Sequence, residues 1–369
     1  MKVKIGELTK IKTGKLDANA ASEDGQYPFF TCSKEPLRIS TYSYDCECVL
    51  VAGNGDLNVK YYNGKFDAYQ RTYIIEDNGS GKLYMPYLYY FMEGYIEELR
   101  KQAIGGVIKY IKLGNLTDAL IELPSVDEQK SIVEILVKTK GILEKRNDEL
   151  NALDNLIKAR FVEMFGDPIS NPMKWDIYRF EECLERIDNG KSFICSDKPR
   201  TGDNPAILKL SAATYGDYRP NENKALLDES LFVESSEVHV GDLLFTRKNT
   251  PELVGTAAYV QNTPPKLMMP DLIFRLVPNE KVNAVFLWQL INCKEFRPVI
   301  QAISGGSAKS MSNISKERLG KIKVICPPRE LQDSLIPFVE QTDKSKVAVR
   351  RALDEAQLLF DSLMQQYFG

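Results

Sequence analysis

Residues capable of catalysis are scarce in this sequence. The chain contains a single histidine, His239, so acid–base or nucleophilic catalysis by imidazole has almost nothing to work with. His239 lies in a Val-His-Val sequence that we interpret as part of an ordinary strand. The seven cysteines include no Cys-x-x-Cys pair, which indicates reduced thiols of a cytosolic protein and no structural zinc site. The sequence therefore predicts a chain without a catalytic or metal site.

Motifs for nucleotide chemistry are also missing. The Pro-Pro pairs at residues 264–265 and 327–328 do not fit the Asn/Asp-Pro-Pro-Tyr/Phe loop of an adenine methyltransferase, and no Gly-x-x-x-x-Gly-Lys-Ser/Thr loop occurs. Residues 53–56 (Gly-Asn-Gly-Asp) lack the third glycine of a dinucleotide-binding turn, which favours a hairpin turn. Glu280 and Lys281 lack the spacing of a metal nuclease and indicate a solvated loop. We therefore expect no ATP-driven or methyl-transfer chemistry in this chain.

An internal repeat organises the chain. Residues 124–166 align without gaps with residues 327–369, an offset of 327 − 124 = 203 positions. The identities are Pro124/Pro327, Gln129/Gln332, Ser131/Ser334, Thr139/Thr342, Leu150/Leu353, Leu156/Leu359, Phe165/Phe368 and Gly166/Gly369. The preceding segments also repeat, because Gln102 to Lys109 matches Gln301 to Lys309 with one residue inserted. The repeating unit is therefore a globular domain followed by a helix.

The repeated segments have the heptad spacing of helices that pack lengthwise. In alternating steps of four and three residues, apolar side chains fill seven of ten positions from Ile132 to Met164 and eight of ten from Leu335 to Tyr367. A helix over residues 128–165 would be about 57 Å long, which indicates a spacer, although a simple core helix pair remains an alternative. Pro337 should kink or delay the start of the second helix. The expected packing residues are Ile132, Leu136, Leu143, Leu150, Leu153, Ile157, Leu335, Val339, Val349, Leu353, Phe360 and Leu363.

Each globular part is predicted to be a mixed α/β domain. Short strands are expected at residues 48–53, 59–62 (before a turn at Asn63-Gly64), 72–75, 206–210, 242–246, 257–260 and 272–277. Helices are expected at residues 85–100 and 282–297. The expected domain boundaries place the globular domains at residues 1–124 and 171–326 and the helical spacers at residues 125–170 and 327–369.

Composition and charge limit the class of protein further. Hydrophobic residues make up 43% and charged residues 27% of the chain, as in a folded protein. No apolar run approaches the roughly 20 residues that a bilayer requires, and lysines interrupt every N-terminal apolar run, so a soluble, cytoplasmic protein is expected. The net charge of −3 counts on its face against a nucleic-acid binder. A protein that reads DNA with this charge needs local basic patches or a basic partner.

These residues resemble the specificity subunits of type I restriction-modification systems, over essentially the whole chain. The resemblance lies in the domain-helix-domain-helix order, the Pro-x-x-x-Glu-Gln junction that begins at Pro124, and the helix end at residues 161–168. Residues 241–255 and 305–315 of the second domain add to it. The second junction departs from the pattern, because Leu331 stands where the first copy has Glu128.

The resemblance implies a division of labour among several chains. Two target-recognition domains would each read one half of a split, asymmetric site on double-stranded DNA, separated by two long antiparallel helices packed as a coiled coil with pseudo-twofold symmetry. Helix length would set the spacing between the half-sites. Two methylation subunits would bind S-adenosylmethionine and flip the target adenine. Restriction subunits, which combine a translocase and a nuclease, would use ATP and Mg²⁺, so this chain itself is expected to bind no cofactor.

Side chains that read DNA should be Arg, Lys, Asn, Gln or Ser on loops, because these match base edges and phosphates. The candidates in the first domain are Ser33, Lys34, Asn54, Asn58, Lys60, Gln70, Arg71 and Lys109. Those in the second domain are Lys209, Ser211, Arg247, Lys248, Asn249, Ser307, Lys309 and Ser310. Lys109 and Lys309 follow Gly-Gly pairs at equivalent positions of the repeat, so both are predicted to hold phosphates. Any one of these residues could equally be an ordinary solvated side chain.

Two other functions remain open from the sequence alone. A coiled-coil scaffold or adaptor whose domains bind protein would share the long helices. A specificity subunit of a type II-like methyltransferase-nuclease would share the domains.

Overall fold

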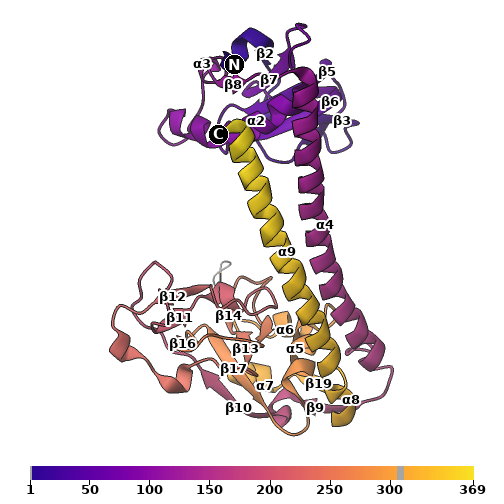
Figure 1. The fold of residues 1–369 in the computed structure, drawn as a ribbon. Coiled ribbons are helices and arrows are strands. Elements are labelled where there is room, and N and C mark those ends of the chain that lie inside the picture. The colour runs from indigo at the N-terminus through magenta and orange to yellow at the C-terminus, as the bar shows by residue number, and fades with distance from the viewer. Residues whose placement is uncertain (1, 306–310) are drawn as a thin grey trace. The chain divides into compact units, whose positions relative to one another are not determined.

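The structure, a computed structural model, describes residues 2–305 and 311–369 and divides into two compact units (Figure 1). Unit 1 comprises Met1–Glu149 and Val349–Gly369, and unit 2 comprises Leu150–Ala348. The chain passes from one unit to the other twice. Each passage lies inside a long helix, α4 (Val126–Phe165) or α9 (Ile336–Phe368). Each unit therefore contains the beginning of one long helix and the end of the other.

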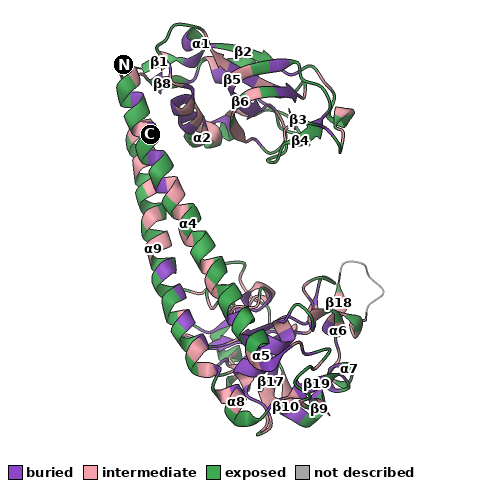
Figure 2. Ribbon diagram, turned by 90° about the vertical axis from the view of Figure 1, so that its right-hand side faces the viewer, coloured by how far each residue is buried: buried purple, intermediate pink, exposed green. Residues whose placement is uncertain are grey.

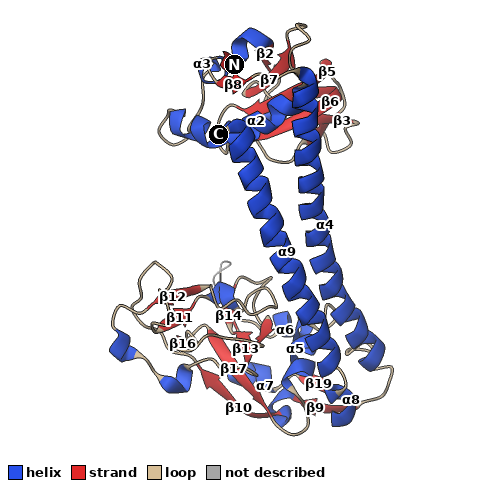
Figure 3. Cartoon of the chain, viewed as in Figure 1, coloured by secondary structure: helices blue, strands red, loops and turns tan. Residues whose placement is uncertain are grey.

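Unit 1 is built on a six-stranded sheet in the order β2-β7-β5-β6-β3-β4. Figure 3 shows strands of this unit in red beside the helix α2. Its elements are β1 (Lys2–Lys4), α1 (Ile5–Leu8), β2 (Thr9–Thr13), β3 (Tyr27–Phe30), β4 (Leu37–Ile39), β5 (Tyr44–Ala52), β6 (Val59–Ala68), β7 (Thr72–Asp77), α2 (Met85–Gln102), α3 (Leu113–Thr117) and β8 (Leu120–Glu122). The apolar face of α2, with Leu88 and Met92 fully buried, packs on the strands through Val49, Val51 and Ile75. A small sheet of β1 and β8 closes the domain.

Unit 2 contains a four-stranded sheet in the order β10-β17-β13-β15 and a three-stranded sheet in the order β12-β11-β16. Its elements are β9 (Asp176–Arg179), β10 (Leu184–Asn189), β11 (Ala206–Leu208), β12 (Asn223–Ala225), β13 (Leu243–Thr246), β14 (Lys248–Asn249), β15 (Ala257–Tyr259), β16 (Leu267–Met268), β17 (Ile273–Pro278), α5 (Ala284–Asn292), α6 (Arg297–Ala302), β18 (Ser312–Asn313), α7 (Lys316–Gly320), β19 (Lys323–Cys326) and α8 (Arg329–Asp333). The buried Phe286 of α5 packs on Phe161 and Phe165 of α4.

The internal repeat extends through the strands of both units. The order β2-β7-β5-β6 in unit 1 corresponds to β10-β17-β13-β15 in unit 2, and each of these neighbouring pairs is antiparallel. The pair of β1 and β8 corresponds to the pair of β9 and β19. The predicted class, mixed α/β with two β-rich domains and two long helices packed together, is confirmed.

The predicted packing residues lie on α4 and α9, where buried and half-buried positions alternate with exposed ones (Figure 2). Leu136, Ile157, Leu335, Val339 and Val349 are buried. The half-buried residues are Ile132, Leu143, Leu150, Leu153, Leu353, Phe360 and Leu363. A buried lysine at a heptad position, Lys346, pairs with Asp154 of α4 at 2.5 Å and with Asp343 at 3.2 Å, both within unit 2. A polar pair of this kind specifies helix register.

A buried glutamine fixes the first turn of each repeated helical segment. In unit 1 the Gln129 Oε1 atom accepts from the Tyr84 amide (2.8 Å), while Nε2 donates to the Lys82 and Pro124 carbonyls (2.9 and 3.0 Å). In unit 2 the Gln332 Oε1 atom accepts from the Asn283 amide (3.0 Å), while Nε2 donates to the Lys281 and Pro327 carbonyls (2.9 and 2.8 Å). Both glutamines have no exposed surface. The shared glutamine of the two junctions is thus a structural clamp between the helical segment and its globular domain.

The two helix starts differ as the sequence predicts. Glu128 forms a capping box with Ser125, whose amide donates to Glu128 Oε2 (2.9 Å). Unit 2 has Leu331 at that position, and the helix restarts at Ile336 after the short α8. Pro337 is the second residue of α9, where its missing amide hydrogen removes no helical hydrogen bond. The predicted delay of the second helix by Pro337 is confirmed.

Three local predictions are wrong. His239 lies in a turn, where its amide donates to the Asp242 carboxylate (2.9 Å), so β13 begins at Leu243. Asn63 and Gly64 continue β6, because β5 supplies paired partners for both; the hairpin turn at residues 53–58 is the one that closes the two strands. The helix expected at residues 282–297 divides into α5 and α6, because the ring of Pro298 would clash with the carbonyl of Lys294 in a continuous helix.

Replacing Gln129 with Ala should destabilise unit 1 by roughly 3 kcal/mol, because one buried amide and two carbonyls lose their partner. Gln332→Ala should do the same in unit 2. The exposed Gln341 of α9 provides the matched control, and Gln341→Ala should change stability by less than about 0.5 kcal/mol. Urea titrations followed by circular dichroism measure the difference, and equal midpoints for the three variants would show that the clamp is dispensable.

Candidate nucleic-acid interface

Hydrogen bonds join the loops that carry the predicted DNA-reading residues of unit 1. The Gly53 amide donates to the Arg71 carbonyl (2.8 Å), and the Gly55 amide donates to the Lys109 carbonyl (3.0 Å). The Asn58 side-chain amide donates to the Cys32 carbonyl (2.8 Å). The loops at residues 31–36, 53–58, 69–71 and 103–110 therefore meet, and we call them the unit 1 loop cluster. The residues of this unit that are predicted to read DNA are distant along the chain, but they lie on adjoining loops.

The cationic side chains of this cluster are available for a ligand. Lys34, Arg71 and Lys109 are exposed, and within residues 2–305 and 311–369 none of them forms a salt bridge. Sequence analysis missed Lys15, which is exposed on the neighbouring loop, where the Gln70 amide donates to the Leu16 carbonyl (2.9 Å). No local motif marks Lys15; only the strand pairing brings it here. Four cations that form no salt bridge among the described residues therefore lie on connected loops, although the overall charge of the chain is −3.

Other predicted residues of unit 1 have structural partners. Lys60 is half-buried, its ammonium donates to Asn58 Oδ1, and burial lowers its pKa below the usual value for lysine. The Gln70 side chain donates to Asp17 (2.8 Å). Ser33 is exposed and its amide donates to Thr31 Oγ1 (3.2 Å), and Asn54 is half-buried beside Tyr110.

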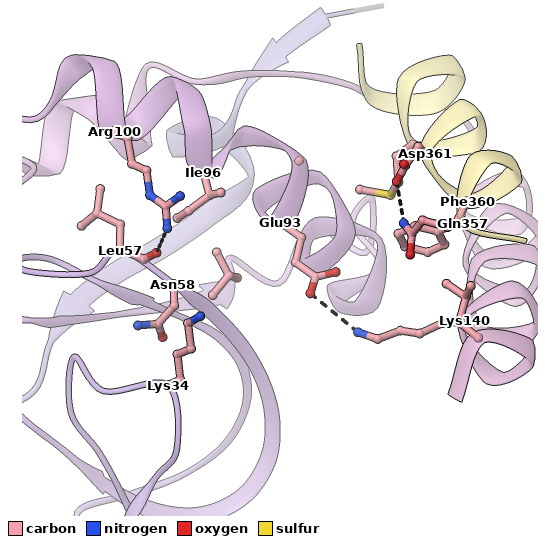
Figure 4. Close-up of a pocket in the computed structure, with 14 residues that line it drawn as sticks. Lys34, Leu57, Asn58, Glu93, Ile96, Arg100, Lys140, Gln357, Phe360 and Asp361 are labelled. Carbon is pink, nitrogen blue, oxygen red and sulfur yellow. Dashed lines mark hydrogen bonds and ion pairs between the residues drawn. The ribbon is translucent and has the colours of Figure 1, made fainter. Parts of the chain in front are cut away.

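A cavity of about 670 Å³ lies within unit 1 beside this cluster (Figure 4). Lys34 and Asn58 line it on one side, and Phe360 of α9 lines it on the other. Polar groups at its rim are already paired: Arg100 donates to the Leu57 carbonyl (3.1 Å) and Lys140 lies 3.7 Å from Glu93. Lys34 and Asn58 thus adjoin both the loop cluster and this cavity.

The residues of unit 2 that are predicted to read DNA form more ion pairs and hydrogen bonds with neighbouring side chains than those of unit 1. Lys209 and Ser211 share one carboxylate, Glu222, at 3.6 and 2.8 Å. Lys248 lies 3.9 Å from Asp271. Asn249 is buried, and its side-chain amide donates to Thr214 Oγ1 (3.1 Å).

Arg247 occupies a more unusual position. Its guanidinium lies over the Phe274 ring at 4.9 Å, and Nη2 donates to Asn313 Oδ1 at 3.4 Å. The Nε atom is buried and has no hydrogen-bond partner among the residues that the structure describes. A half-buried guanidinium with donors to spare is typical of a group that binds an acceptor.

Backbone bonds show which loop positions correspond between the units. The Gly53 amide donates to the Arg71 carbonyl, and the Ile111 amide donates to the Gly53 carbonyl (2.9 Å). The Arg247 amide likewise donates to the Leu272 carbonyl (3.0 Å), and the Ile314 amide donates to the Arg247 carbonyl (2.8 Å). Arg247 therefore corresponds to Gly53. The same loop architecture presents different side chains in the two units.

The predicted equivalence of Lys109 and Lys309 stays a prediction. Ile104 is bridged to Tyr110 in unit 1, and Gly305 is bridged to Asn313 in unit 2. Ser307, Lys309 and Ser310 themselves lie outside the described residues.

Among the described residues no cluster of His, Cys, Asp and Glu could hold a metal ion. None of the described helices is long and apolar enough to cross a membrane.

The comparisons with known proteins identify the family. The chain is 42% identical to the type I restriction enzyme EcoDI specificity subunit of Escherichia coli over an alignment covering 99% of this chain and 87% of that protein. It is 31% identical to the EcoEI specificity subunit of Escherichia coli over 52% of this chain and 32% of that protein. Residues 1–152 match the family described as the type I restriction modification DNA specificity domain.

A solved structure shares the fold. The S subunit of a type I restriction-modification system from M. genitalium superposes with a TM-score of 0.62 at 16% identity, covering 100% of this chain and 96% of that one. The chain belongs to the family of type I restriction-modification specificity subunits. Its function is therefore that of a non-catalytic DNA specificity subunit, as the resemblance in its sequence predicts, and the adaptor and type II-like alternatives are not supported.

Removing the unpaired cation of Lys109 should weaken DNA binding equally for all sequences. The slope of log K against log salt concentration should become shallower by about one, because one phosphate contact is lost. Lys101→Ala is the matched control, since Lys101 is exposed on α2 and already pairs with Glu98. Fluorescence anisotropy over a salt series measures both variants, and an unchanged slope for Lys109→Ala would remove Lys109 from the interface.

Proposed function

We propose that residues 1–124 and 171–326 are two target-recognition domains, and that each reads one half of a split, asymmetric site on double-stranded DNA. The observation that carries this proposal is the repeated loop architecture around Gly53 and Arg247. The same backbone framework supports different side chains in the two units. Such a pair of domains would read two different sequences.

The long helices are the proposed spacer and the docking surface for two methylation subunits. Large apolar side chains remain exposed on both helices, including Val137 and Ile142 on α4 and Val347 and Leu358 on α9. Large apolar side chains exposed along a helix are typical of an interaction site. They support binding of apolar partner surfaces along the helices, with the helix length setting the half-site spacing.

The chemistry of the assembly is proposed to reside on the partner chains. S-adenosylmethionine would be bound by the methylation subunits, and ATP and Mg²⁺ by the restriction subunits with their translocase and nuclease activities. This chain would supply the position on DNA at which those subunits act. Its own contribution is the set of polar and cationic loops described above.

Arg247→Ala should relax discrimination at one half-site and leave the other unchanged, because one guanidinium that can bind a base edge is removed from one unit only. The expected loss of discrimination is about 1–3 kcal/mol at one position. Methylome sequencing of a strain that expresses the chain with its methylation subunit measures both half-sites. Arg186→Ala is the control, since Arg186 lies on β10 and pairs with Glu185 and Asp188. A methylation motif unaltered by Arg247→Ala would refute the assignment.

A further inference from the structure

Unit 1 presents two branched aliphatic side chains at the tip of a closed loop. Ile104 and Tyr110 exchange both backbone hydrogen bonds (3.0 and 2.8 Å), so residues 105–109 project beyond them. Val107 is fully exposed, at 103% of its reference area, and Ile108 is 62% exposed. Within residues 2–149 no other large aliphatic side chain is as exposed as these two, and in the rest of unit 1 only Leu358 of α9, at 70%, is more exposed than Ile108. Because apolar side chains in water are unfavourable, their presence at this tip indicates a surface that covers them in a complex.

The loop tip is fixed to the cationic loop cluster. Tyr110 is bridged to Asn54 as well as to Ile104, and the Lys109 carbonyl accepts from the Gly55 amide (3.0 Å). Gly105 has a φ of +122°, and a Cβ atom there would lie 2.5 Å from the Ile108 carbonyl oxygen. The conformation that projects Val107 and Ile108 therefore requires glycine at position 105. Gly106, by contrast, has open space where a Cβ would stand.

The charged residues around the loop tip indicate what kind of surface covers Val107 and Ile108 in a complex. The unpaired cations Arg71 and Lys109 lie on the same connected loops, so the covering surface should be anionic around an apolar centre. Double-stranded DNA provides both features, since phosphates flank grooves in which thymine exposes its 5-methyl group. Valine and isoleucine have no polar atom with which to read a base edge. The one major-groove feature that they can recognise is that methyl group.

We propose that Val107 and Ile108 contact the 5-methyl group of a thymine in the half-site read by unit 1. This inference rests on the proposed function and adds a base preference to it. Lys109 and Arg71 hold the flanking phosphates, while the tip provides discrimination against bases that lack the methyl group. With this contact, unit 1 recognises an apolar group of its DNA half-site as well as polar groups.

The test replaces each thymine of the half-site by deoxyuridine, which removes only the methyl group. The unit 1 half-site is the one that Arg247→Ala leaves unchanged in the methylome. The full-length chain, bound to its methylation subunits, should bind DNA about fourfold more weakly when one particular thymine is replaced, as burial of one methyl group predicts. In a variant carrying Val107→Ala and Ile108→Ala, that substitution should have no effect.

Glycine variants separate the tip conformation from the residues that it carries. Gly105→Ala should abolish the sensitivity to deoxyuridine, whereas Gly106→Ala should retain it. Thermal unfolding confirms that each variant is folded, as expected for changes on an exposed loop.

The outcomes separate this inference from the function on which it rests. Equal binding of all deoxyuridine duplexes by the wild-type complex, or a sensitivity that persists in the double variant, would overturn the thymine contact alone. A 2-aminopurine base in the half-site provides a further test. If the wild-type complex unstacks this base and the double variant does not, the tip inserts between base pairs, and this result would also overturn the thymine contact. A methylome without two separable half-sites would instead overturn the proposed function.

Discussion

Each long helix begins in one hydrophobic core and ends in the other, and a buried glutamine ties the start of each helical segment to its domain. Val133 and Leu136 of α4 belong to the core of unit 1, while Phe161 and Phe165 of the same helix belong to the core of unit 2. Gln129 and Gln332 each form hydrogen bonds with one backbone amide and two backbone carbonyls. Both crossings between the units therefore lie inside helices whose ends are anchored in a domain.

The two units share a pattern of backbone hydrogen bonds, but the side chains on their loops differ. Gly53 and Arg247 make the same backbone hydrogen bonds, yet one position carries no side chain and the other carries a guanidinium. A protein whose task is to distinguish DNA sequences benefits from this separation, because base-reading side chains can change without disturbing backbone pairing or core packing.

The sequence predicts the framework better than the interface. Heptad spacing and the repeated Gln129 and Gln332 suffice for the helices, because packing of long helices depends on local periodicity. The sequence does not indicate that Lys15 lies beside the unit 1 loop cluster, because only the pairing of strands from distant parts of the chain brings it there. Asn249 is predicted to read DNA but is buried against Thr214, because sequence does not distinguish a polar side chain on a loop surface from one beneath it. The 42% identity to a specificity subunit confirms the family that the junction motifs indicate.

The most direct test of the account is to shorten both helices where the chain crosses between the units. Deleting one heptad from each, residues 145–151 and 350–356, removes no fully buried side chain and keeps the two-turn periodicity of the packing. Methylome sequencing of a strain expressing this chain with its methylation subunit should show a shorter spacer between two unchanged half-sites. A spacer of the original length, in a complex that still methylates DNA, would contradict the central claim that the helices set the distance between two reading domains.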